Sequence, residues 1–164
     1  MKKFLLFMMM LFSVTVFAGT VNAKVTNKIN FGISPKELKN IIKSEPLSDS
    51  HDNGNYAVYY FANVEDPLGV KRQLNSFAFS ENHLFSAVFD SVTTDEEHAK
   101  IIEAYKKNIN KISKEKMNIK EHKGALLLYN SKKIIEIYRV VDHTFINVAL
   151  YSAGKLNNSL KNYE

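Results

Sequence analysis

The sequence predicts an α+β domain with an antiparallel sheet of about six strands, in helix-βββ-helix-βββ order, and with its helices packed on one face. Two capping-box signals, each followed by an amphipathic segment, predict the two helices. Two groups of three β-favouring segments, joined by short turns, predict strands that pair antiparallel. The two halves therefore share one plan, although no residue-level repeat links them.

The first helix is predicted over residues 35–43. Ser34 is placed to cap it, Pro35 suits its first position, and Glu37 completes the capping box. Pro46 ends the segment, because proline cannot continue a helix. The apolar residues fall on one face at helical spacing: Leu38, Ile41 and Ile42.

The second helix is predicted over residues 95–113, with Thr94 and Glu97 as its capping box. Its acidic start and basic end both suit the helix dipole. Its apolar stripe consists of Ile101, Tyr105, Ile109 and Ile112, and a lysine face consists of Lys100, Lys107, Lys111 and Lys114. We interpret the lysines as a solvated face, with Glu103 and Lys107 as an ion pair. A patch for an acidic partner, an anionic lipid surface or a wall polymer is the alternative.

The strands are predicted from runs of β-branched and aromatic residues. They span residues 56–61, 74–80, 84–89, 125–129, 134–141 and 144–151. In the hairpin of the second and third strands, alternation predicts one core face made of Phe77, Phe79, Phe85 and Phe89. Polar composition predicts turns over 48–55, a loop over 113–123 and a frayed tail over 152–164.

Residues 1–23 have the pattern of a cleaved signal peptide. Two lysines precede an apolar run over residues 4–18, and Val21 and Ala23 are small residues before a predicted cut at Lys24. The run is shorter than the roughly 20 residues of a membrane span, so no stable membrane anchor is expected. Residues 24–164 then form one domain. The predicted location is the periplasm, with secretion as the alternative.

The composition excludes several chemistries. The chain has no cysteine, which excludes disulfides, a thiolate nucleophile and a cysteine zinc site. Loss of Lys2 and Lys3 lowers the formal net charge from +5 to +3, so nucleic acid is not an expected partner. No nucleophile-elbow motif, phosphate loop or spaced metal ligands occur, and His98 is read as helix surface. We therefore expect no catalytic residues, no cofactor and no metal.

The opening of the chain resembles a known plan. The stretch FGISPKELKNII, followed by Pro46 and Tyr59-Tyr60-Phe61, is similar to small bacterial envelope proteins with a Gly-hydrophobic-Ser/Thr helix start before a β-meander. These are the SmpA-type outer-membrane assembly lipoproteins and the β-lactamase-inhibitor-like domains. The similarity covers residues 29–89, lacks the lipidated cysteine and has Glu45 where glycine is usual. It implies a non-enzymatic, protein-binding role.

We therefore expect an exported, non-enzymatic protein-binding module whose partner is another envelope or secreted protein. One specific form is an inhibitor or immunity protein against an envelope-acting toxin or hydrolase. The predicted partner-binding residues are Tyr56, Tyr59, Tyr60, His51 and Asp52, because tyrosine beside a polar loop is typical of interfaces. The alternatives are a small-ligand or lipid carrier and a cell-wall-acting enzyme. The sequence leaves the oligomeric state open.

Overall fold

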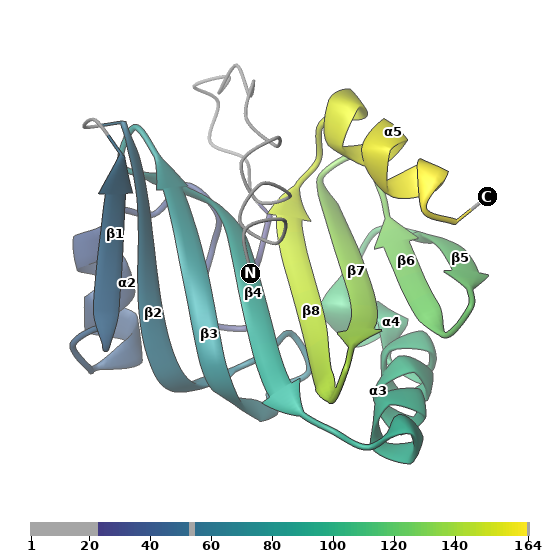
Figure 1. The fold of residues 1–164 in the computed structure, drawn as a ribbon. Coiled ribbons are helices and arrows are strands. Elements are labelled where there is room, and N and C mark those ends of the chain that lie inside the picture. The colour runs from purple at the N-terminus through teal and green to yellow at the C-terminus, as the bar shows by residue number, and fades with distance from the viewer. Residues whose placement is uncertain (1–22, 53–54, 164) are drawn as a thin grey trace.

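The computed structural model describes residues 23–52 and 55–163, which form one eight-stranded antiparallel sheet with four helices (Figure 1). The strand order is β1-β2-β3-β4-β8-β7-β6-β5. Each half is a helical segment followed by a four-stranded meander, and the two meanders join through β4 and β8. The first half holds α2 (Pro35–Ile42), β1 (Ser48–Asp52), β2 (Tyr56–Glu65), β3 (Lys71–Ser80) and β4 (His83–Val92). The second holds α3 (Asp95–Lys107), α4 (Ile109–Ile112), β5 (Asn118–His122), β6 (Ala125–Tyr129), β7 (Lys133–Val140), β8 (His143–Leu150) and α5 (Ala153–Lys161).

The predicted six strands and helix-βββ-helix-βββ order are wrong, although the α+β class and the antiparallel sheet agree with the structure. The two missed strands are β1 and β5, which form the outer edges of the sheet. Every residue of β1 is exposed, and β5 is exposed except for the half-buried His122. Because neither strand buries an apolar face, neither carries the alternating pattern by which strands are recognised. Such polar edge strands also discourage pairing with other chains.

Both predicted capping boxes are confirmed. The Glu37 N–H donates to the Ser34 hydroxyl at 3.3 Å, and the Ser34 N–H donates to the Glu37 carboxylate at 2.7 Å. Thr94 and Glu97 repeat this arrangement at the start of α3. The single helix expected over residues 95–113 is divided at Asn108 into α3 and α4.

The lysine face of α3 also differs in detail from its prediction. Lys106, rather than Lys107, pairs with Glu103 at 2.8 Å. The same ammonium reaches Glu121 of β5 at 2.9 Å. This cation therefore ties the helix to the outer strand instead of serving only an exposed helical pair.

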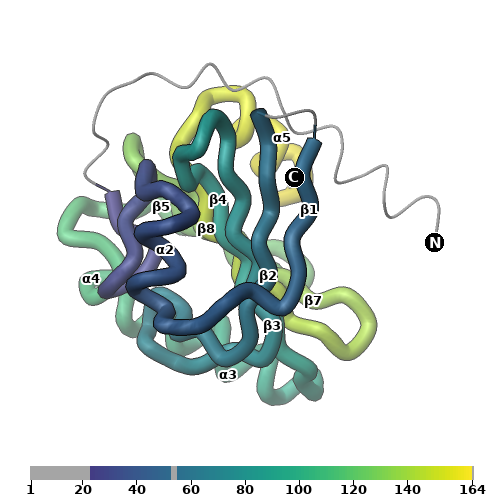
Figure 2. Tube along the Cα trace, turned by 90° about the vertical axis from the view of Figure 1, so that its left-hand side faces the viewer, coloured from purple at the N-terminus to yellow at the C-terminus, as the bar shows by residue number. Residues whose placement is uncertain are grey.

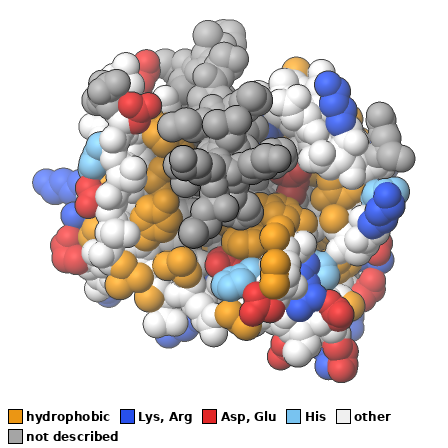
Figure 3. Space-filling model, in the orientation of Figure 1, with side chains coloured by type: hydrophobic (Ala, Val, Ile, Leu, Met, Phe, Trp, Pro, Cys, Tyr) orange, Lys and Arg blue, Asp and Glu red, His pale blue; other side chains and the backbone are white. Residues whose placement is uncertain are grey.

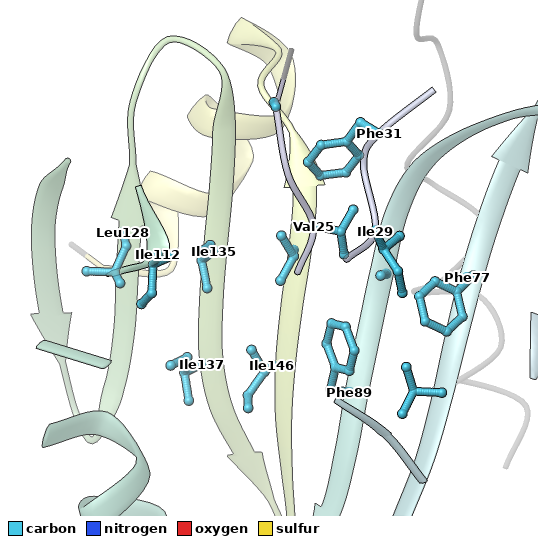
Figure 4. Packing of buried hydrophobic residues seen from close by; sticks show 14 of the residues in the cluster. Val25, Ile29, Phe31, Phe77, Phe89, Ile112, Leu128, Ile135, Ile137 and Ile146 are labelled. Atoms are coloured by element: carbon cyan, nitrogen blue, oxygen red, sulfur yellow. The ribbon is translucent and has the colours of Figure 1, made fainter. Parts of the chain in front are cut away.

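The core lies between the sheet and the helices α2, α3 and α4. Leu38 of α2, Tyr105 of α3 and Ile112 of α4 pack in one cluster with apolar residues of the sheet. The segment before α2 enters the same cluster: Val25 and Ile29 lie among Phe77, Phe89, Ile135 and Ile146 (Figure 4). The buried Lys133 holds this segment, because its ammonium donates to the carbonyl oxygens of Lys24 at 3.1 Å and Ile112 at 2.7 Å.

The predicted phenylalanine face is interrupted by a bulge. Phe77, Phe79 and Phe89 lie in the core, but the β3–β4 register shifts between Ala78 and Phe79. Phe79 then pairs with Leu84, which takes the core position. Phe85 is buried against Tyr56 instead, with ring centroids 6.0 Å apart. An extra residue in one strand resets alternation, which a period-two pattern does not reveal.

The helices do not all lie on one face, as the prediction required. Figure 2 shows α2 on one side of the sheet and α5 on the other. Ser152 caps α5 by accepting the Lys155 N–H at 3.1 Å, and the Lys155 ammonium lies 3.5 Å from Glu136 of β7. Leu127 and Ile134 are buried on this second side.

Candidate functional site on the open sheet face

The open face is the side of the sheet opposite α2, α3 and α4. Helix α5 covers it at β6 and β7, whereas over β2, β3, β4 and β8 no helix of the described residues lies on it (Figures 1 and 2). One cross-strand row on this part consists of Tyr60, Ser76, Val88 and Asn147. In the space-filling view of this face, hydrophobic side chains gather toward the lower middle (Figure 3).

Four large apolar side chains are exposed at one end of strands β3, β4 and β7. They are Leu74 (43% exposed), Val92 (53%), Val140 (39%) and Val141 (85%), which we call the apolar rim. Strand register places Leu74, Val92 and Val140 beside Asp90 and His143. Leu74 lies opposite Asp90. His143 lies opposite both Val92 and Val140. Exposed apolar residues grouped at one end of a sheet indicate a candidate interaction surface.

Stacked aromatic rings continue the rim across β7 and β8. The rings of Tyr138 and Phe145 stack with centroids 5.5 Å apart and an interplanar angle of 25°. The rings of Phe145 and His143 stack at 6.0 Å and 21°. Offset stacking of this type stabilises the rings relative to one another. The surface beside the rim therefore carries aromatic rings that pack against one another.

An ion pair lies in the middle of these apolar groups. The imidazole Nδ1 of His143 is 2.9 Å and 3.1 Å from the two carboxylate oxygens of Asp90. Its Nε2 is 3.8 Å from Asp142 in the adjoining turn. The hydrogen bond and charge of Asp90 raise the pKa of His143 above its usual value, with a smaller contribution from Asp142. The side chain of Asp90 is only 15% exposed, whereas that of His143 is 40% exposed.

The rim includes a strained residue. Val141 begins the two-residue turn between β7 and β8 and has a φ of 58°. Glycine, asparagine and aspartate are the residues that adopt this conformation readily, and for a β-branched side chain it is an outlier. Strained positions are retained where the surroundings enforce them, and they cluster at functional sites. A strained and almost fully exposed valine is thus a second feature that marks this end of the sheet.

The five residues predicted from sequence divide between the two faces. Tyr56, Tyr60 and Asp52 share the open face, since Asp52 lies opposite Tyr56 in the β1–β2 register. Burial raises the pKa of Tyr56 to about 12. Tyr59 and His51 lie on the other face, where their rings meet edge to face at 5.6 Å. Tyr59 also packs edge to face on the core residue Phe79 at 5.5 Å.

The apolar rim and its ion pair were missed from the sequence. Leu74, Val92 and Val140 read as ordinary strand residues, because the pattern does not tell which apolar residues a helix will cover. Asp90 and His143 are 53 residues apart and meet only through β4–β8 pairing. One local signal was available: Val140-Val141-Asp142 places a valine in a tight turn where asparagine or glycine is favoured.

His98 is buried, so its prediction as helix surface is wrong. Its Nε2 donates to the carbonyl of Gly124 at 2.6 Å, because a carbonyl only accepts. Its Nδ1 lies 2.9 Å from the Thr144 hydroxyl, which in turn lies 2.7 Å from Thr93. Both ring nitrogens are therefore engaged in joining α3, β8 and the β5–β6 turn. This ring borders a pocket of about 480 Å³ that also includes Arg139, Glu103 and Glu121.

Within residues 23–52 and 55–163, no group of three or more histidine and acidic side chains is placed to hold a metal ion. The described helices include none with the length and apolar character needed to cross a bilayer. No protein-family model, curated protein or solved structure matches the chain.

Proposed function

We propose that this protein is an exported, non-enzymatic protein-binding module whose interface is the apolar rim and the adjoining open face of the sheet. The observation that carries the proposal is the enclosure of the Asp90–His143 ion pair by exposed apolar side chains and stacked rings. Interfaces combine these features: an apolar and aromatic centre, few charges, and individual polar groups that fix orientation.

The physical chemistry supports binding at this surface. Removing apolar surface from water is favourable by roughly 25 cal/mol for each Å². A partner that covers the half-exposed side chains of the rim is therefore held by their burial. The sheet beneath is a rigid support, because β3, β4, β8 and β7 are hydrogen-bonded neighbours. Little side-chain and backbone freedom is then lost on association, which favours affinity.

The partner follows from the proposed location. A signal peptide over residues 1–23 sends the domain to the periplasm, or alternatively outside the cell, so the partner is another envelope or secreted protein. An inhibitor or immunity protein against an envelope-acting toxin or hydrolase is the specific form that this proposal favours. Such a protein acts by covering its target with a rigid surface and requires no reactive side chain of its own.

The test is capture of a partner by the full-length chain, expressed with a C-terminal tag and purified from the cell envelope. Val92→Asp places a charge in the apolar rim and is expected to abolish capture. Ile119→Asp is the matched control, because Ile119 is 50% exposed but lies on the outer strand β5. A protein lost with both variants or with neither would contradict the proposed interface. A lipid or glycan recovered in place of a protein would instead support the carrier or the wall-acting enzyme.

A further inference from the structure

We propose that the partner segment presents a basic side chain flanked by apolar residues, that its cation pairs with Asp90, and that His143 competes with it for this carboxylate. This inference rests on the proposed function and specifies the chemistry of its partner. The apolar flanks cover the apolar rim, while the cation reaches the half-buried ion pair at the centre of the patch. An arginine suits this position best, since its planar guanidinium pairs with carboxylates and stacks on aromatic rings.

The charge balance around the rim favours a cation. Three cations near the rim pair with acidic side chains: Arg139 with Asp95, Arg72 with Asp66 and Lys100 with Glu96. In contrast, Asp90 and Asp142 share a single imidazole. The group of three carries a net charge of −1 when His143 is protonated and −2 when it is neutral. A cationic side chain therefore complements the negative charge of this group.

Burial of Asp90 strengthens its attraction for the cation of the partner. The side chain of Asp90 is flanked in its row by Leu74 on β3 and by Phe145 on β8. Covering the apolar rim would remove the remaining water, and charge interactions are stronger in such a low-dielectric site than at an open surface. The geometry therefore links the two parts of the proposal, because the apolar contacts and the charge pair reinforce one another.

The position of His143 makes this docking dependent on pH. The groups that face its ring are Asp90 on β4, Asp142 in the turn and Phe145 on β8, with Val92 and Val140 on either side. Tyr138 of β7 also stacks on Phe145. Protonated His143 pairs with Asp90 and repels an incoming cation, whereas neutral His143 donates at most its Nδ1–H to that carboxylate and carries no charge that repels the cation. Affinity is expected to rise as pH increases through the pKa of His143.

The experiment is an NMR titration of the isotope-labelled full-length protein with two short peptides. The probe is N-acetyl-Val-Arg-Val-amide, and its control is the same peptide with neutral citrulline in place of arginine. We expect the arginine peptide to shift the signals of Val92, Phe145 and Val141 and to bind roughly tenfold more tightly than the citrulline peptide. We also expect its binding to weaken as the pH is lowered.

Variants separate the possible outcomes. Asp90→Asn is expected to remove the preference for arginine, whereas Asp52→Asn, at an exposed carboxylate of the outer strand β1, is expected to retain it. His143→Gln is expected to remove the pH dependence. Equal shifts by both peptides would overturn this inference while leaving an apolar protein interface in place. Shifts outside the patch, or no shifts, would overturn it while capture of a folded partner still tests the proposed function.

Discussion

His143 of β8 contacts Asp90 of β4 through its Nδ1 at 2.9 Å, at the junction where the two four-stranded meanders meet. The pair lies among exposed apolar residues rather than in the polar surroundings usual for a surface ion pair. One contact therefore joins the two halves of the sheet and occupies the centre of the proposed interface.

Val141→Asn is expected to stabilise the domain while weakening partner binding. Asparagine tolerates the left-handed backbone conformation that valine adopts at a penalty of about 1 kcal/mol. The free energy of unfolding, measured with urea, should therefore rise by about that amount. Val140→Asn is the control, because that residue lies in β7 with extended backbone and offers no strain to relieve. A loss of stability with Val141→Asn would contradict the assignment of strain at this turn.

Lys133→Met is expected to change how stability depends on pH. Burial lowers the pKa of Lys133 to about 8 in the folded protein, below the usual 10.5 of an exposed lysine. Between these values the unfolded chain binds more protons than the folded chain, so the contribution of this residue makes stability rise with pH. The slope is roughly 1 kcal/mol per pH unit. Subtracting the unfolding free energy of the variant from that of the parent at pH 8 and pH 10 isolates this contribution.

The difference between parent and variant removes other titrations from the comparison. Burial raises the pKa of Tyr138 to about 12, so that residue contributes a fall in stability at higher pH in both proteins. A parent-minus-variant difference that stays constant between pH 8 and pH 10 would show that the Lys133 ammonium titrates normally. It would also argue against its burial beneath Lys24 and Ile112.

Thr144→Val is expected to destabilise the fold by about 2 kcal/mol. The hydroxyl of Thr144 joins His98 of α3 to Thr93, and valine of nearly the same shape leaves both partners buried and unsatisfied. Ser76→Ala removes a hydroxyl from the half-buried open face and is expected to change stability by far less. Unfolding in urea measures both variants. Equal effects would indicate that the network around His98 contributes no more than an ordinary surface hydroxyl.

Local signals in the sequence predicted the starts of α2 and α3, but they did not predict α5, which lies where a frayed tail was expected. The other features that the sequence did not reveal depend on relationships between distant residues. The capping boxes at Ser34 and Thr94 depend on residues three apart, so their geometry is readable from sequence alone. The bulge beside Phe85 and the pairing of β4 with β8 depend on strand register, which only the assembled sheet defines. The polar strands β1 and β5 lack an apolar pattern and form because neighbouring strands offer unpaired backbone groups.

The candidate site shows the same division. The sequence singled out the tyrosines of β2 because aromatic residues stand out in a short strand, but alternation alone did not show which of them faces away from the helices. Tyr59 packs on Phe79, while Tyr60 lies on the open face. Val92 and Val140 are exposed because α5 does not extend over them. No local sequence pattern shows which part of the sheet a distant helix will cover.

Site-specific photocrosslinking in intact cells tests the central claim most directly. A photoreactive phenylalanine analogue is placed at Val92 in the apolar rim and, as a control, at Ile119 on β5, which is exposed to a similar extent. The proposed interface predicts a discrete crosslinked protein from position 92 that is absent from position 119 and is lost when Val141→Asp is added. No crosslinked protein from position 92, or the same products from both positions, would contradict a binding function for this end of the sheet.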